Sequence, residues 1–113
     1  MNRHERLNAY RIMWVFVFFD LPVVETKDRK AATKFRFQLL KDGFTMLQYS
    51  VYIRHCASKE AVDVHVKRVN KWVPKKGHVS ILQITDKQYG DIINIWGSCR
   101  EPVPTAPAQL SFF

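Results

Sequence analysis

The chain has 113 residues, enough for one packed core and too few for two. Hydrophobic residues make up 47% of it and charged residues 25%, a balance that excludes an intrinsically disordered chain. The formal net charge of +8 favours a polyanionic partner, either nucleic acid or an acidic membrane surface. The longest apolar run, residues 12–19, is too short to span a bilayer, so we expect a cytoplasmic protein with no membrane insertion.

The first elements in chain order are a lead-in, a strand and a helix. Residues 1–10 are polar and basic, and we assign this N-terminal lead-in no role in the fold. Residues 12–19, IMWVFVFF, are β-branched and aromatic, which predicts a central strand that stops at Asp20. Thr26 is a candidate N-cap for a basic helix that runs to about Asp42.

The next elements are two short strands, a helix and a longer strand. Residues 44–55 are rich in β-formers with a polar interruption near 48–50, which predicts two strands joined by a tight turn. Ser58 begins a second helix with valines at helical spacing, and Pro74 ends it. The segment HVSILQIT then predicts a fourth strand, and DIINIWG a short fifth one.

The order β-α-β-β-α-β is that of the ferredoxin-like arrangement, with a single antiparallel sheet and both helices on one face. The sequence therefore predicts an α+β domain of this kind, with a short fifth strand, over residues 11–97. Residues 98–113 form a proline-rich tail with an apolar C-terminus.

The first strand is apolar on both faces, although helices on one side of the sheet cover only one of them. We therefore expect a second copy to pack sheet against sheet across a twofold axis, which gives a face-to-face homodimer. An axis near the end of this strand would bring two copies of Asp20 together. We also expect residues 91–96 to pair with the second copy, because a short strand after the fourth has no central position in its own sheet.

Three segments, VFFDLPV, DRKAATKFRFQLLKDGFTMLQYSVYIRHC and PKKGHVSILQITDKQYGDI, closely resemble the Cas2 family of small CRISPR-associated adaptation proteins. The likeness is strongest to the form found beside single-effector systems. It rests on a combination of three features: a strand that ends in Asp, a basic helix, and the pattern Q-x-S-V followed by an aromatic residue. The resemblance implies a ferredoxin-like homodimer that joins integrase subunits and holds duplex DNA for spacer insertion. It also implies a second activity, magnesium-dependent cleavage of single-stranded RNA or duplex DNA.

By the same resemblance, Asp20 matches the family's metal-binding aspartate and is the candidate catalytic residue, with Mg²⁺ as the expected cofactor. One carboxylate per chain is too little for Mg²⁺, whereas two across a dimer axis suffice. Ser50 and Tyr52 match a supporting segment. Many relatives place Tyr before the aspartate where this chain has Phe19, which favours a scaffold over an enzyme. The alternative for Asp20 is that it only caps the following turn.

Basic residues on the two helices are candidate nucleic-acid contacts, which would bind phosphates without base specificity. The alternative is a solvated face, the usual place of helix lysines, although acidic residues do not balance these cations. The candidates are Arg29, Lys30, Lys34, Arg36, Lys67, Arg68, Lys71 and Lys75.

The C-terminal segment QLSFF places Leu110, Phe112 and Phe113 at the end of a proline-rich spacer. Exposed aromatic side chains promote aggregation unless something buries them. We expect these residues to dock on the integrase, with packing onto their own dimer as the alternative.

Histidine and cysteine residues give no sign of a metal site. The histidines, His65 and His78 among them, show no catalytic or metal-ligand spacing, which favours surface or edge positions. Cys56 and Cys99 lack a C-x-x-C pattern, which favours free or buried thiols.

Overall fold

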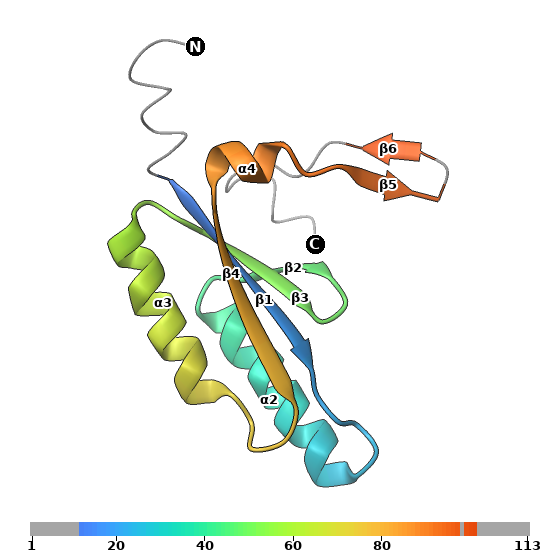
Figure 1. The fold of residues 1–113 in the computed structure, drawn as a ribbon. Helices are drawn as coiled ribbons and strands as arrows, with labels where there is room; N and C mark the ends of the chain where they lie inside the picture. The colour runs from blue at the N-terminus through green and yellow to red at the C-terminus, as the bar shows by residue number, and fades with distance from the viewer. Residues whose placement is uncertain (1–11, 98, 102–113) are drawn as a thin grey trace.

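The computed structural model describes residues 12–97 and 99–101 (Figure 1). Its elements are β1 (Met13–Asp20), α2 (Thr26–Lys41), β2 (Thr45–Gln48), β3 (Val51–Cys56), α3 (Lys59–Trp72), β4 (His78–Thr85), α4 (Asp86–Gly90), β5 (Asn94–Trp96) and β6 (Cys99–Glu101). No helix in this part of the chain is long and apolar enough to cross a bilayer. The predictions for residues 1–10, and for Leu110, Phe112 and Phe113, lie outside the described residues.

Four strands form one antiparallel sheet in the order β2-β3-β1-β4. The central strand is β1, whose last residue, Asp20, lies opposite His78, the first residue of β4. Helices α2 and α3 pack side by side on one face of this sheet (Figure 1). The ferredoxin-like α+β fold predicted from the sequence is therefore confirmed.

The main core lies between the sheet and the two helices. Every second residue of β1 contributes to it, because alternate side chains of a strand point to the same face. The predicted apolar stripe of α2 is confirmed, since Ala32, Phe35 and Leu39 are all buried. The core residues from β1 and α3 are Val15, Val17, Phe19, Val62 and Val69. Each large apolar side chain buried here stabilises the fold by about 1.5–3 kcal/mol relative to exposure.

The short helix α4, which the sequence analysis did not predict, covers part of the opposite sheet face. The ring of Tyr89 stacks on the indole of Trp14, with centroids 3.8 Å apart. The indole N–H of Trp14 also donates to the Asp86 carboxylate at 2.7 Å. The second apolar face of β1 is thus partly covered by the chain itself, whereas the sequence had indicated a second copy as the cover.

The fifth strand is shorter than predicted and pairs within its own chain. It covers Asn94–Trp96, and its antiparallel partner is β6, which falls in the range that the sequence analysis assigned to the tail. This hairpin is a separate two-stranded sheet and extends away from the main sheet (Figure 1). Because β6 occupies one edge of β5, the prediction that residues 91–96 pair with a second chain now applies only to the other edge of β5.

The two long helices begin differently. The predicted cap of α3 is confirmed, because the Ser58 side chain accepts a hydrogen bond from the Ala61 N–H. The predicted cap of α2 is wrong. Thr26 is already the first helical residue, and Glu25, with an extended backbone, occupies the N-cap position without a side-chain cap bond.

Candidate functional site

Asp20 lies exposed at the end of the central strand. Its neighbour across the sheet, His78, is also exposed. On the other side of β1, the Phe19 N–H donates to the Ser50 carbonyl at 3.1 Å. The fold therefore places a carboxylate, an imidazole and the turn between β2 and β3 at one end of the sheet. The sequence alone does not connect His78 with Asp20, since their proximity depends on the pairing of β1 with β4.

Asp20 offers only part of a metal site. Within residues 12–97 and 99–101, no group of three or more His, Cys, Asp or Glu side chains could hold a metal ion. Magnesium is commonly held by one or two carboxylates, with water and substrate phosphate in the remaining positions. An exposed Asp20 fits such a partial shell, and the other ligands would have to come from a second chain, water or a phosphate.

Phe19 points away from the candidate site. It is buried, and its ring packs edge-on against Phe35 with centroids 5.2 Å apart. Since successive residues of a strand point to opposite faces, a tyrosine at position 19 would carry its hydroxyl on the helix side of the sheet. The lack of a tyrosine hydroxyl at position 19 is therefore weaker evidence against a metal site than the sequence alone indicated.

The two supporting residues have structural roles. Ser50 adopts a φ of +68°, the left-handed conformation that closes the turn between β2 and β3. Tyr52 is buried, and its ring lies 5.5 Å from that of Phe19. Burial raises the pKa of Tyr52, although the nearby Arg36 opposes the shift. Tyr52 is thus a neutral core residue, on the opposite face of the sheet from Asp20.

Gly77 keeps the turn before β4 in close contact with the residues that follow Asp20. Its φ is +105°, and a β-carbon there would lie 2.6 Å from Leu21 Cδ2 and 2.9 Å from the Asp20 carbonyl oxygen. We expect Gly77→Ala to lower the free energy of unfolding by about 1–3 kcal/mol, measured by urea denaturation. Gly90→Ala is the control, because a β-carbon at Gly90 meets no atom within 4 Å. Equal stability of the two variants would contradict this role of Gly77.

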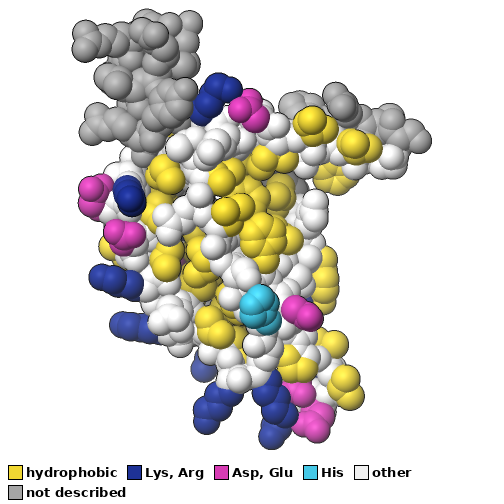
Figure 2. Space-filling view, in the orientation of Figure 1, with side chains coloured by type: hydrophobic (Ala, Val, Ile, Leu, Met, Phe, Trp, Pro, Cys, Tyr) yellow, Lys and Arg dark blue, Asp and Glu magenta, His cyan; other side chains and the backbone are white. Residues whose placement is uncertain are grey.

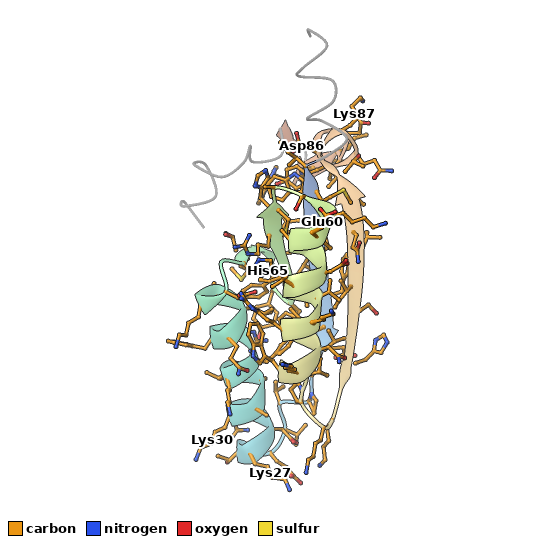
Figure 3. All side chains as sticks on the ribbon, turned by 90° about the vertical axis from the view of Figure 1, so that its left-hand side faces the viewer. Lys27, Lys30, Glu60, His65, Asp86 and Lys87 are labelled. Atoms are coloured by element: carbon orange, nitrogen blue, oxygen red, sulfur yellow. The ribbon has the colours of Figure 1, made fainter. Side chains whose placement is uncertain are left out.

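Basic side chains gather at the same end of the molecule. Figure 3 shows Lys27 and Lys30 at the N-terminal end of α2, and Figure 2 shows Lys and Arg side chains clustered below the sheet. A pocket of about 300 Å³ joins this helix end to the turn between α3 and β4. Its lining includes Leu21, Pro22, Lys27, Asp28, Lys75 and Lys76. We call Lys27, Lys30, Lys75 and Lys76 the basic end.

Five of the predicted phosphate contacts are exposed lysines. These residues are Lys30, Lys34, Lys67, Lys71 and Lys75. Lys27 was absent from the predicted set, because only the packing of α2 beside the turn after α3 brings it near Lys75. The sequence signal that was available is its position in the first turn of a helix rich in lysine.

Two of the predicted arginines are held by contacts within the chain. Arg29 donates to the carbonyl oxygens of Val23 at 3.2 Å and Val24 at 2.7 Å, which fixes the loop before α2. Arg68 pairs with the Asp42 carboxylate at 2.7 Å. These bonds leave the guanidinium groups less free to bind phosphate than the lysines.

The third predicted arginine, Arg36, lies against two aromatic rings. Its guanidinium carbon is 5.4 Å from the centroid of Phe19 and 4.8 Å from that of Tyr49. The sequence alone does not single out Tyr49, because its stacking on Arg36 depends on the contact between α2 and the turn that joins β2 to β3.

His65 is buried, which corrects the predicted surface position. Its Nδ1 lies 2.5 Å from the Asp42 carboxylate, and Figure 3 shows His65 on the side of α3 that faces α2. The backbone carbonyl of Asp42 accepts a further bond from Arg54. His65 falls between Val62 and Val69 on the buried stripe of α3, a signal already present in the sequence. The cluster joins the end of α2 to α3 and is distant in the fold from Asp20.

Comparison with known proteins places the chain in a family. The family model described as CRISPR associated protein Cas2 matches residues 13–92. The chain belongs to the Cas2 family. This match spans all four strands of the main sheet and both long helices, so the resemblance found in the sequence is confirmed. The Cas2 family acts in CRISPR adaptation.

Three relatives match this Cas2-family chain over 93–100% of their own length. It is 54% identical over 101 residues to a protein of Parvibaculum lavamentivorans, covering 89% of this chain and 100% of the relative. It is 49% identical over 109 residues to a protein of Flavobacterium psychrophilum, covering 96% and 93%. It is 48% identical over 107 residues to one of Paracidovorax avenae, covering 95% and 99%. All three relatives bear the name CRISPR-associated endoribonuclease Cas2.

Proposed function

We propose that this Cas2-family protein is a dimeric scaffold of CRISPR adaptation that binds duplex DNA and bridges integrase subunits for spacer insertion. The basic end, together with the exposed Lys67 and Lys71 of α3, is the observation that carries this proposal. Three lysines and one aspartate line its pocket, so cations there outnumber carboxylates. Such a surface attracts the phosphate backbone and releases counterions on binding, without reading bases.

A second copy is the proposed partner of the remaining apolar sheet surface, which Figure 2 shows over the main sheet. Phe18 of β1 and Leu82 of β4 are 38% and 47% exposed. Leu82 lies opposite Phe16, so it shares the sheet face of Phe16 and Phe18. Sheet-against-sheet packing of two copies would bury these side chains. The mass of the protein in solution distinguishes one copy from two.

Salt dependence tests the proposed DNA contacts. We expect reversal of charge at Lys67, Lys71 and Lys75 to reduce the slope of log affinity against log salt concentration by about 2–3, since each lost phosphate contact removes about 0.9. The measurement is duplex-DNA binding by fluorescence anisotropy over a range of salt concentrations. The mass of the variant in solution should remain that of the unmodified protein.

A second comparison uses one charge reversal at a time. Lys71→Glu is the test variant, and Lys59→Glu is its control. Lys59 is an exposed lysine at the other end of α3, next to Glu60. We expect its reversal to change the slope less than Lys71→Glu does. An unchanged slope in the triple variant would contradict the proposed interface.

A magnesium-dependent endonuclease acting on single-stranded RNA or duplex DNA is the second candidate function. Two observations favour it: Asp20 stands exposed at the end of the central strand, and the relatives are named endoribonucleases. Asp20 would hold Mg²⁺ together with oxygens from a second copy or a substrate phosphate. The ion, when bound, would polarise a phosphoryl oxygen or lower the pKa of a bound water. The basic end would hold the strand beside this carboxylate.

A further inference from the structure

We propose that Tyr49, supported by Arg36, is a stacking site for an unpaired nucleobase of a single-stranded nucleic acid. This inference rests on the proposed nucleic-acid binding and adds a contact to a base, whereas the basic end contacts phosphates. Tyr49 is 75% exposed, although its ring lies over the guanidinium of Arg36. Exposed aromatic rings are the usual platforms on which proteins stack unpaired bases.

The cation beneath the ring favours a polyanionic ligand. The salt bridges among the described residues involve the carboxylates of Asp42 and Asp91, and neither is paired with Arg36. The Nε of Arg36 is buried and has no hydrogen-bond partner in this part of the chain. Phe19 lies 5.4 Å from the guanidinium carbon, so Arg36 rests on a buried ring while it supports an exposed one. Cation–π contacts of this kind preorganise the exposed ring.

The turn between β2 and β3 fixes Tyr49 near the candidate site. The left-handed Ser50 reverses the chain directly after Tyr49. The Ser50 carbonyl accepts from the Phe19 N–H, which ties the turn to the residue before Asp20. A base stacked on Tyr49 would therefore bring its strand to the end of the sheet that carries Asp20.

Binding of single-stranded RNA by the full-length protein tests the stacking site. The probes are a short RNA strand containing 2-aminopurine and a matched strand that carries abasic sites. We expect Tyr49→Ala to weaken binding of the first strand by about 5- to 150-fold, the range for loss of one stacked base. Binding of the abasic strand should not depend on Tyr49. Tyr49→Phe should retain binding and quench 2-aminopurine fluorescence as the unmodified protein does, since it keeps the ring.

Trp96→Ala is the matched control, because Trp96 is a 54% exposed aromatic residue on β5, in the hairpin that extends away from the main sheet. Equal losses for Trp96→Ala and Tyr49→Ala, or equal losses of Tyr49→Ala on the base-containing and abasic strands, would overturn the stacking site. So would full affinity of Tyr49→Ala. If the unmodified protein binds duplex DNA while Tyr49→Ala has no effect on single strands, only the stacking site fails. If it binds neither nucleic acid, the proposed function fails as well.

Discussion

Asp20→Ala is expected to reduce magnesium-stimulated cleavage to the level seen without metal, while integrase-dependent spacer insertion continues. The reason is that Asp20 is the carboxylate exposed at the end of β1, whereas the basic end and the apolar sheet surface do not depend on it. The measurement combines cleavage of RNA and duplex DNA, with and without Mg²⁺, with a spacer-insertion assay.

Asp28→Ala is the control for this experiment. Asp28 is an acidic residue that lines the pocket of the basic end, and it has no proposed metal role. Mass in solution and DNA affinity should be measured for both variants, so that loss of the dimer is not mistaken for loss of the cleavage activity. If Asp20→Ala eliminates insertion while dimerisation and DNA binding persist, our preference for the scaffold function over the nuclease function is wrong.

Asp42→Ala is expected to lower the free energy of unfolding by about 1–3 kcal/mol, the range for leaving a buried polar group without its hydrogen-bond partner. The Asp42 side chain is 7% exposed and contacts both His65 and Arg68. Without it, the buried His65 loses its partner and α2 loses an attachment to α3. Denaturant unfolding followed by far-ultraviolet circular dichroism measures the change.

Asp91→Ala provides the matched comparison. Asp91 also pairs with a cation, Lys87, but its side chain is 65% exposed. Exposed pairs of this spacing contribute about 0.3–0.5 kcal/mol. A loss for Asp42→Ala as small as that for Asp91→Ala would contradict the assignment of Asp42 as a structural link between the helices.

Local patterns in the sequence predicted most of the fold. The β-branched run of residues 12–19, the stripe of α2 and the Ser58 cap each specify a local structure, because strand alternation, helical spacing and capping involve neighbouring residues. The missed helix α4 had a signal too, since Thr85 and Gln88 form a capping box. Its five residues are too few for a periodic pattern. β6 was missed because it opens the proline-containing tail.

Tertiary contacts decided how the candidate site is arranged. The residue types of the site, an aspartate ending a strand and lysines on helices, were evident in the sequence. The sequence did not show that His78 lies opposite Asp20 or that Lys27 lies near Lys75. It also did not show that Arg36 stacks on Tyr49. Each of these contacts joins different elements, so it depends on strand order and helix packing.

The sequence by itself determined the order of strands and helices, the ferredoxin-like class and the Cas2 family, because these follow from local patterns and from a combination of motifs. Only the tertiary structure decided which charges remain free. The guanidinium of Arg68 is paired with Asp42, and His65 is buried, whereas the lysines of the basic end are exposed. The physical reason is that burial and pairing depend on which elements lie side by side, and residues far apart in the chain meet there.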